Sequence, residues 1–354
     1  MINLDLEKGT NIKIALIGFG NSACRLAELL VEREKEITDK YGVKIICTAI
    51  ATAHHSKVVS LQGIDLLSAL ELIKSKQSLS NLKQVEIVTD SFQAIDKSKA
   101  DIVIETTLLS LENGEPAYSH IKHALLASKS VVTANKGPLA FAASELLALA
   151  QKQGCFLRYE STVMDGTPIF NLARHTLPLV KFHRIRGIVN STTNFILTEM
   201  EAGKDFDNAL KEAQERGIAE ANASLDIDGW DAAVKATVLA NCLMNASLKP
   251  TDVARTGISN ITSTELLASI KAGKKIRLVM DIELINSEVQ ARVAPTKIAK
   301  EDIFYNIDAF SNILALETDL MGTLMIVEQE PTLTQTAYGL LSDLLSIVEQ
   351  TKIT

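Results

Sequence analysis

Short apolar runs alternate with helix-like segments over the first part of the chain. Residues 12–18 form a continuous apolar stretch that ends at a glycine, and similar runs follow at 43–51, 100–107 and 130–135. The segments between them place apolar residues at helical spacing. Buried strands that alternate with helices are typical of a parallel sheet covered on both faces. The pattern therefore predicts a Rossmann-type, doubly wound α/β domain.

The pattern changes from about Phe156. The stretches FLRYESTV, HRIRGIVN, KIRLVMDIELI and EVQARVAP mix apolar and polar positions, as strands with one exposed face do. Asn286-Ser287 joins the last two, which predicts a hairpin. We expect an α+β domain with an open, mainly antiparallel sheet at 156–329. The first domain would span 1–155 and be completed by a C-terminal helix at 330–354, with Pro331 in its first turn.

A glycine motif follows the first predicted strand. Residues 18–23 read GFGNSA, a GxGxxA pattern between a buried strand and a helix. In such a turn the glycines let a pyrophosphate approach the backbone, the alanine permits close helix packing, and the helix N-terminus faces the phosphates. The motif also occurs in ordinary tight turns, but its context favours a dinucleotide site. The residues expected to form it are Gly18, Phe19, Gly20, Asn21 and Ala23.

The end of the second predicted strand bears on the choice of dinucleotide. Residues 51–57 read ATAHHSK and contain no acid. Sites that prefer NAD usually hold the ribose 2′-hydroxyl with a carboxylate at this point. Lys57 would instead attract a 2′-phosphate, so the sequence favours NADP, with NAD as the alternative. A solvated Lys57 with no phosphate contact explains the same residue equally well.

Polar residues also end the next two predicted strands. Thr106 and Thr107 follow one of them, and Lys136 follows the other. Ligands of doubly wound sheets bind beyond these carboxyl ends, where hydroxyls and an amine can bind the nicotinamide ribose or a reacting oxygen. Gly137-Pro138 would also suit an ordinary loop turn, which leaves both interpretations of Lys136 open.

An acid and a lysine stand four residues apart in an otherwise apolar helix predicted from 230 to 244. One interpretation is a surface ion pair, with Asp228 as the helix cap and Asp231 in a capping-box-like start. However, a helix that is apolar on every face is buried, and a buried ion pair costs several kcal/mol of desolvation per ion. We therefore expect Asp231 and Lys235 to form part of a functional site.

Two further acids precede this helix, Glu220 and Asp226. Several carboxylates around one amine suit a substrate that carries its own ammonium group. A shielded lysine such as Lys235 can also exchange a proton with a substrate, as hydride transfer to or from a carbonyl requires.

Composition narrows the class of partner. The chain has 354 residues, of which 47% are hydrophobic and 22% charged, as in a soluble protein of two or three domains. A net charge of −7 and an aromatic content of 5% argue against nucleic-acid binding. No signal peptide or membrane-spanning run is evident, which predicts a cytoplasmic location. The four cysteines are far apart, so we expect reduced thiols rather than disulfides or a zinc site.

The chain resembles homoserine dehydrogenase along nearly its whole length. The resemblance is carried by GFGNSA, IETT, VVTANKGPLA, YESTVMDGTPIF, GIVNSTTNFIL and RGIAEANASLDIDGWDAAVK. The length is similar to that of the short form, without a fused aspartate kinase or a C-terminal regulatory domain. The resemblance implies NAD(P)-dependent interconversion of L-homoserine and L-aspartate 4-semialdehyde, on the route to threonine, isoleucine and methionine.

The same resemblance implies roles for individual residues. Lys235 corresponds to the catalytic acid/base, Glu220 and Asp231 to acids around the substrate's amino group, and Lys136 to a lysine beside the nicotinamide and the reacting oxygen. It further implies a homodimer built on the central sheet and a monovalent cation, Na⁺ or K⁺, in the turn at 160–167. The carbonyl oxygens around that cation would come from Glu160, Val163, Asp165 and Thr167.

Three short stretches depart from the family's pattern. Asn-Ser-Thr-Thr-Asn stands where Asn-Gly-Thr-Thr-Asn is usual, Asn222-Ala223 replaces an acid followed by proline, and residues 328–332, EQEPT, replace a glycine-rich turn over the cofactor. Acids beside a dinucleotide phosphate would weaken its binding. Two alternatives therefore stand beside the main interpretation. Asn222 suggests a related NADP oxidoreductase on another amino-acid aldehyde, and the altered turn suggests a non-catalytic binding or regulatory paralogue.

Overall fold

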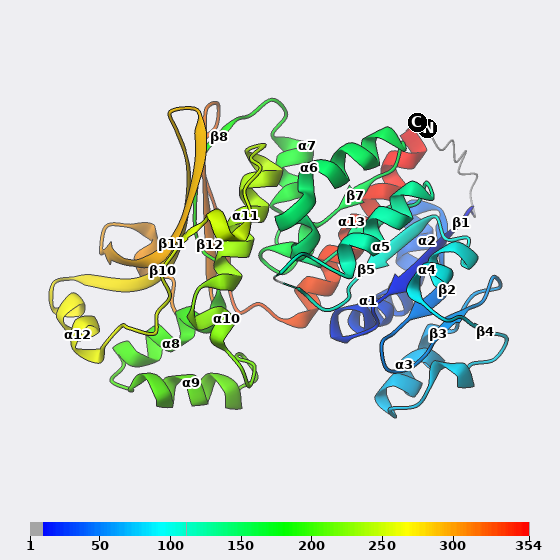
Figure 1. The fold of residues 1–354 in the computed structure, drawn as a ribbon, viewed down its shortest axis with the longest axis horizontal. Helices are drawn as coiled ribbons and strands as arrows, with labels where there is room; N and C mark the ends of the chain where they lie inside the picture. Colours follow the sequence, from blue (N-terminus) through cyan, green and yellow to red (C-terminus); the bar gives the residue numbers. More distant parts are fainter. Residues whose placement is uncertain (1–9, 111, 354) are drawn as a thin grey trace. The chain divides into compact units, whose positions relative to one another are not determined.

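The computed structural model describes residues 10–110 and 112–353, with side chains described as far as Thr351. The chain forms two compact units (Figure 1). One comprises Met1–Phe170 and Thr332–Thr354, and the other Asn171–Pro331. No helix among the described residues has both the length and the apolar character that a membrane crossing requires.

The first unit contains a seven-stranded sheet, here sheet A, in the order β4-β3-β2-β1-β5-β6-β7. The five strands from β2 to β7 are parallel, while β3 and β4 run antiparallel to their neighbours. This confirms the predicted doubly wound sheet. The strands are β1 (Thr10–Ile17), β2 (Val43–Ala51), β3 (Lys57–Val59), β4 (Glu86–Ile87), β5 (Ile102–Glu105), β6 (Ser130–Thr133) and β7 (Leu157–Arg158).

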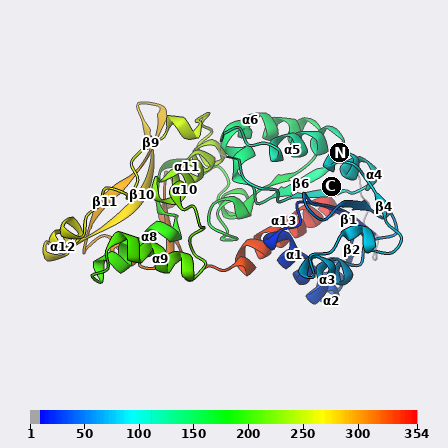
Figure 2. The same ribbon diagram turned by 60° about the horizontal axis from the view of Figure 1, so that its bottom comes forward.

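Helices cover both faces of sheet A (Figure 2). The C-terminal helix α13 lies beside α1, contributes to the same apolar core and belongs to the first compact unit. Pro331 lies outside the helix, however, because α13 begins at Leu333. The helices of this unit are α1 (Asn21–Glu32), α2 (Glu34–Tyr41), α3 (Leu66–Lys74), α4 (Ser91–Lys97), α5 (Ala117–Leu126), α6 (Lys136–Lys152) and α13 (Leu333–Ile353).

The stretch FLRYESTV does not belong to the second sheet. Its first residues form β7, which pairs with β6 at the edge of sheet A, and Glu160–Thr162 forms a 3₁₀ helix. Polar residues in this stretch suggested a strand with one exposed face, but they stand at the edge of the parallel sheet and in the turn after it. The first unit consequently extends to Phe170 rather than to residue 155.

The second unit contains a six-stranded sheet, here sheet B, in the order β13-β12-β8-β10-β11-β9. Its pairs are antiparallel except for β9 with β11, which agrees with the predicted open, mainly antiparallel sheet. Asn286 and Ser287 both have positive φ and join β10 to β11 in the predicted hairpin. The strands are β8 (Phe182–Ile188), β9 (Ala254–Arg255), β10 (Lys274–Ile285), β11 (Glu288–Ala299), β12 (Asn312–Thr318) and β13 (Gly322–Glu328).

Helices of the second unit pack against the central strands of sheet B. Helices α8, α11 and α12 contact β10, and α11 also contacts β11 (Figure 1). Residues of α11 on most of its faces are buried, as the apolar pattern predicted. The helices are α7 (Phe170–Thr176), α8 (Ser191–Glu201), α9 (Phe206–Glu215), α10 (Ser224–Ile227), α11 (Trp230–Leu243) and α12 (Ser263–Lys271).

Candidate active site

The glycine motif forms a tight turn between β1 and α1. Gly18 has a φ of 90°, and a Cβ atom there would lie 2.5 Å from the carbonyl group of Thr106. Only glycine satisfies both conditions. Gly20 caps α1, and a Cβ atom on it would meet nothing within 4 Å, while Ala23 is fully buried. The turn therefore leaves space beside the N-terminus of α1, where a phosphate group is stabilised by the helix.

Thr106, Thr107 and Lys136 lie at the same carboxyl edge of sheet A. The hydroxyl of Thr106 donates to the Gly18 carbonyl at 3.1 Å, and Lys136 is the first residue of α6. Asn135 caps α6 by accepting the N–H of Gly137, and its amide nitrogen donates to the carbonyl of Thr107 at 3.1 Å. Asn135 is a site residue that the sequence interpretation did not single out, although asparagine before a helix is a recognisable cap.

Lys57 begins β3 and pairs in register with Ala51, the last residue of β2. The residues between them form a closed turn, in which the Thr52 hydroxyl accepts the N–H of His55 at 2.7 Å. Lys57 is half-buried and stands at the carboxyl end of β2. The second strand of this fold carries the group that meets the adenosine ribose, and a role of Lys57 in that contact stays a prediction.

The turn at 160–167 packs against α13. The Glu160 carboxylate is buried and accepts two backbone N–H groups, and its own N–H donates to Asp343 of α13 at 2.7 Å. Asp165 has a positive φ and accepts the Thr336 hydroxyl at 2.7 Å. A Cβ atom on Gly166 would collide with the backbone of α13. Among the described residues, no hydrogen bond ends at the carbonyl oxygens of Val163, Asp165 and Thr167.

In the second unit, Lys235 is held by two acceptors. Its Nζ atom lies 3.0 Å from Oδ2 of Asp231 and donates to the Val189 carbonyl at 2.5 Å. The side chains of Lys235 and Asp231 are only 15% and 14% exposed. The two residues are thus one turn apart on α11, as their spacing predicted, but they are largely shielded from water. This geometry favours the functional interpretation over a solvated surface pair.

The start of α11 differs from the expected cap. Its cap residue is Gly229, which has a φ of 78°, and Asp228 instead follows the short helix α10. Asp228 is therefore not the N-cap, because the left-handed Gly229 intervenes. The guanidinium of Arg255 lies 3.9 Å from the Trp230 ring and donates to the Asp228 carbonyl. These contacts hold the start of α11 against β9 and thereby orient the helix that carries Asp231 and Lys235.

Asn190 joins the acids of this site. Its side-chain oxygen accepts the N–H of Thr193 at 2.9 Å and caps α8. This bond orients the amide, whose nitrogen donates to Oδ1 of Asp226 at 2.7 Å and to Oδ2 of Asp231 at 2.9 Å. Asn190 and the Val189 carbonyl are functional groups that the sequence interpretation missed. The strand-to-helix position of Asn190 was the available signal.

Glu220 is not brought into this hydrogen-bonded group. Its side chain is exposed, and the one hydrogen bond that it makes to another described residue is at its backbone carbonyl, which accepts from the Gln214 side chain at 3.3 Å. Asn222 is likewise exposed, and its side-chain oxygen accepts the N–H of Ser224. The role of Glu220 beside the substrate therefore stays a prediction. Asp226, which the sequence placed near the helix start, is the second acid that the structure joins to Asp231.

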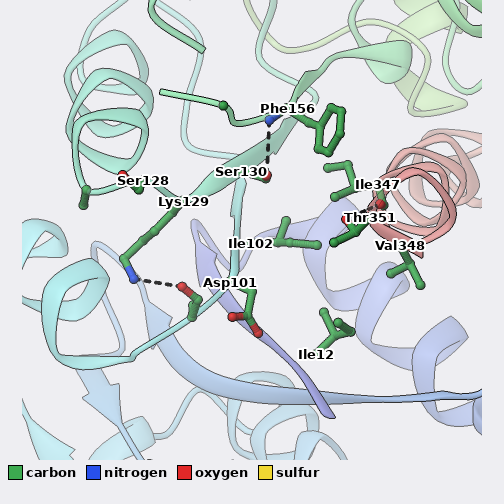
Figure 3. A pocket seen from close by; sticks show the side chains of 13 residues that line it. Ile12, Asp101, Ile102, Ser128, Lys129, Ser130, Phe156, Ile347, Val348 and Thr351 are labelled. Carbon is green, nitrogen blue, oxygen red and sulfur yellow. Dashed lines mark hydrogen bonds between the residues drawn. The ribbon is translucent and has the colours of Figure 1, made fainter. Parts of the chain in front are cut away.

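A cavity of about 180 Å³ lies elsewhere in the first unit (Figure 3). It lies at the amino ends of β5 and β6, opposite the edge that carries the glycine turn. Burial raises the pKa of Asp101 and lowers the pKa of Lys129, which both line it. Their polar atoms are bonded to backbone, the carboxylate to the Lys13 N–H and the amine to the Ala100 carbonyl, each at 2.8 Å. Ligands of doubly wound sheets bind beyond the carboxyl ends of the strands, so this cavity is not where the reaction is expected.

A dinucleotide turn in one unit and a shielded lysine among acids in the other define an NAD(P)-dependent oxidoreductase of an amino-acid-like substrate. The comparisons agree. Residues 168–345 match the family model "Homoserine dehydrogenase", and residues 18–160 match "Homoserine dehydrogenase, NAD binding domain". The chain belongs to the homoserine dehydrogenase family.

Relatives and solved structures match almost the whole chain. Homoserine dehydrogenase of Methanocaldococcus jannaschii is 36% identical over 96% of this chain and 99% of its own length. The NAD(+)-dependent homoserine dehydrogenase of Pseudomonas canavaninivorans is 32% identical over 96% of each chain. A homoserine dehydrogenase structure from Thiobacillus denitrificans superposes with a TM-score of 0.82 at 28% identity, covering 97% of this chain and 74% of that one. These matches favour the homoserine dehydrogenase interpretation over both alternatives.

Proposed function

We propose that this enzyme interconverts L-homoserine and L-aspartate 4-semialdehyde with Lys235 as the acid/base, in the synthesis of threonine, isoleucine and methionine. The observation that carries the proposal is the shielded amine between Asp231 and the Val189 carbonyl. A bound nicotinamide supplies or accepts the hydride. In the direction of reduction, Lys235 donates a proton to the oxygen that becomes the homoserine hydroxyl, and in the reverse direction it accepts that proton.

The paired acids account for the amino group of the substrate. Asn190 holds the carboxylates of Asp226 and Asp231 on either side of one amide nitrogen. Carboxylates grouped in this way suit a substrate that carries its own ammonium group. By resemblance to the family, Lys136 would lie beside the nicotinamide and the reacting oxygen, and Glu220 would bind the substrate's amino group.

Replacing Lys235 by alanine tests this assignment. We expect the Lys235→Ala variant to lose about 10²- to 10⁴-fold in turnover, because the proton donor is absent, with little change in dinucleotide affinity. The assay follows NADPH absorbance with L-aspartate 4-semialdehyde. Lys211→Ala on α9, where the side chain is 73% exposed, is the control and should leave turnover unchanged. Full activity of Lys235→Ala would remove this residue from the role. Oxidation of NADPH only with other aldehydes would refute the substrate.

We infer a preference for NADP over NAD. Lys57 stands at the carboxyl end of β2, and the turn from 51 to 57 brings no carboxylate that would repel a 2′-phosphate. A lower Michaelis constant for NADPH than for NADH is the expected result, and Lys57→Ala should reduce the difference. A strong preference of the wild-type enzyme for NADH would contradict the inference; the Pseudomonas canavaninivorans relative is named NAD(+)-dependent.

We also propose a monovalent cation, Na⁺ or K⁺, in the turn at 160–167. Carbonyl oxygens suit a hard cation, and those of Val163, Asp165 and Thr167 accept no hydrogen bond among the described residues. The fourth carbonyl in the proposed set is that of Glu160. A bound cation stabilises the folded state, so KCl or NaCl should raise the melting temperature above that in choline chloride of equal ionic strength. Equal melting temperatures in the three salts would contradict the site.

We further propose a homodimer formed through sheet B and a cytoplasmic location. Strand β13 is at the edge of the sheet, and its Met325 and Val327 side chains point outward on one face. Leu320 and Met321 are exposed at the turn that leads into this strand. Clustered exposed apolar side chains mark interaction surfaces more often than scattered ones do.

A further inference from the structure

A buried acid and a buried imidazole lie behind the carboxyl edge of sheet A. Glu105, the last residue of β5, is 0% exposed, and His120 on α5 is 5% exposed. Nδ1 of His120 lies 3.6 Å from Oε1 of Glu105 and forms no hydrogen bond within the described residues. Burying two titratable groups costs free energy unless their contacts compensate for it. Neither side chain belongs to the candidate active site.

The Glu105 carboxylate holds the backbone that follows β5. Its Oε1 atom accepts the N–H of Thr107 at 3.1 Å and also accepts the Thr107 hydroxyl. Its Oε2 atom accepts the hydroxyl of Thr133, the last residue of β6, at 3.3 Å. Thr107 and Thr133 thus donate three bonds in all, and both oxygen atoms of the carboxylate accept. Glu105 thereby ties the carboxyl ends of β5 and β6 to each other.

The backbone held in this way forms one wall of the glycine turn. A Cβ atom on Gly18 would lie 2.5 Å from the Thr106 carbonyl and 2.8 Å from the Thr107 nitrogen, so turn and wall are in close contact. The Thr106 hydroxyl donates to the Gly18 carbonyl at 3.1 Å. Because packed groups transmit small displacements, a shift of the peptide between Thr106 and Thr107 would move the glycine turn.

We propose that Glu105 is a positioning residue for the dinucleotide. Its buried carboxylate, backed by His120, fixes the peptide between Thr106 and Thr107 against Gly18 and so sets dinucleotide affinity. Glu105 acts through Thr107, because its own carboxylate is fully enclosed. The proposal rests on the dinucleotide site of the first unit and is independent of which dinucleotide is preferred.

The test compares two changes of carboxylate to amide at opposite ends of the same strand. Glu105→Gln keeps the shape but replaces one of the two accepting oxygen atoms by an N–H donor, so the bond from the backbone N–H of Thr107 or the bond from the Thr133 hydroxyl is lost or reversed. Asp101→Asn is the matched control, because Asp101 precedes β5 at its amino end and accepts the Lys13 N–H. For each variant, the dissociation constants of NADPH and NADH are measured by fluorescence titration, together with the homoserine Michaelis constant and the melting temperature.

We expect Glu105→Gln to raise the dissociation constant of the preferred dinucleotide about tenfold, the factor that corresponds to about 1.4 kcal/mol. The homoserine Michaelis constant should stay within about twofold, and Asp101→Asn should leave dinucleotide affinity unchanged. A Glu105→Gln variant that melts lower but binds dinucleotide as the wild type does would overturn the proposal. Equal losses of affinity in both variants would also overturn it, since that result indicates general destabilisation.

A second variant keeps the proposal testable if Glu105→Gln does not fold. His120→Gln removes the imidazole behind Glu105 while leaving all three donors to the carboxylate in place. Dinucleotide affinity reduced by about threefold or more supports the proposal, and affinity within that factor of the wild type contradicts it. Wild-type protein that binds neither NADPH nor NADH would instead refute the dinucleotide site itself, so the two failures are distinguishable.

Discussion

At the scale of single residues, Asn190 links the architecture of the second unit to its chemistry. An amide can point either way, but the Thr193 N–H is a donor and can bond only to the amide oxygen, so the nitrogen faces Asp226 and Asp231. Two carboxylates close together repel each other unless donors separate them. One asparagine therefore caps α8 and holds together two acids, one of which lies against Lys235.

Replacing Asn190 by aspartate separates these two tasks. Aspartate is as good a helix cap as asparagine, so α8 should keep its start. The new carboxylate has no N–H to donate to Asp226 and Asp231. The three carboxylates would therefore repel one another and move apart. We expect the homoserine Michaelis constant to rise by about tenfold or more while dinucleotide affinity is unchanged, as measured by initial rates and fluorescence titration. An Asn190→Asp enzyme with an unaltered homoserine Michaelis constant would show that the bridge has no role in binding.

Single residues also show which parts of the candidate site could be predicted from the sequence. Asp231 and Lys235 were predictable because an acid and a lysine at helical spacing stood out in an apolar helix. The Val189 carbonyl was not, because every residue carries a carbonyl and only folding brings this one to Lys235. Glu220 illustrates the reverse, since proximity in sequence did not bring its carboxylate into the bonded group.

At the scale of elements, Arg277 anchors α8 to sheet B. It is fully buried on β10, and all five of its N–H donors are used. Glu201, at the end of α8, accepts two of these bonds, and Asp308 accepts another. The opposite end of the same helix presents Asn190. The ion cluster therefore fixes the helix that positions the acids of the site.

The stability of this cluster should depend on pH. Burial alone would raise the pKa of Asp308, but hydrogen bonds from Lys275 and Arg277 outweigh it and hold this pKa below its usual value. A carboxyl with a lowered folded-state pKa stabilises the protein above its unfolded pKa, near 4, and loses that contribution as the pH falls through the folded pKa. We expect Asp308→Asn to unfold at lower urea concentration than the wild type at pH 7.

The same comparison below the unfolded pKa, near 4, should show a smaller difference, because the carboxyl of the unfolded wild-type chain is then protonated and the contribution shrinks as the pH falls toward and through the lowered folded pKa. Asp319→Asn, at an exposed carboxylate on the turn after β12, is the control for general loss of charge. A gap between wild type and Asp308→Asn that is constant from pH 7 to acid would contradict the role of ionised Asp308.

Some helices and strands were easier to predict from the sequence than others. The β10–β11 hairpin was predictable because both strands are long and Asn286-Ser287 tolerates positive φ. The strands β12 and β13 were not predicted, because short apolar runs fit a strand and a buried helix equally well. The edge strand β7 was assigned to the wrong sheet, since its pairing with β6 involves only two residues and depends on long-range contacts.

At the scale of the whole molecule, the chain forms two compact units. The change from apolar runs to half-polar strands lies close to the boundary between them, and the C-terminal helix, which we expected to complete the first domain, belongs to the first unit. The exact boundary was less predictable, because residues 160–170 have no regular period and are held by side-chain contacts with α13.

The exposed apolar side chains of β13 predict that two copies of the chain associate through this strand. Met325 and Val327 are 46% and 44% exposed on one face of an edge strand, where water contact is unfavourable and a second copy would remove it. Light scattering after gel filtration should give the mass of two chains for the wild type. The double variant Met325→Lys, Val327→Lys should give the mass of one chain, because buried unpaired lysines oppose association.

Leu67→Lys, on α3 of the first unit, is the matched control for adding charge at an exposed leucine and should remain dimeric. A double variant that stays dimeric would show that the subunits meet elsewhere, while a monomeric wild type would refute the dimer itself. Unfolding of a dimer includes dissociation, so the urea midpoint of a dimeric wild type should rise with protein concentration. The urea midpoint of a monomeric double variant should be independent of it.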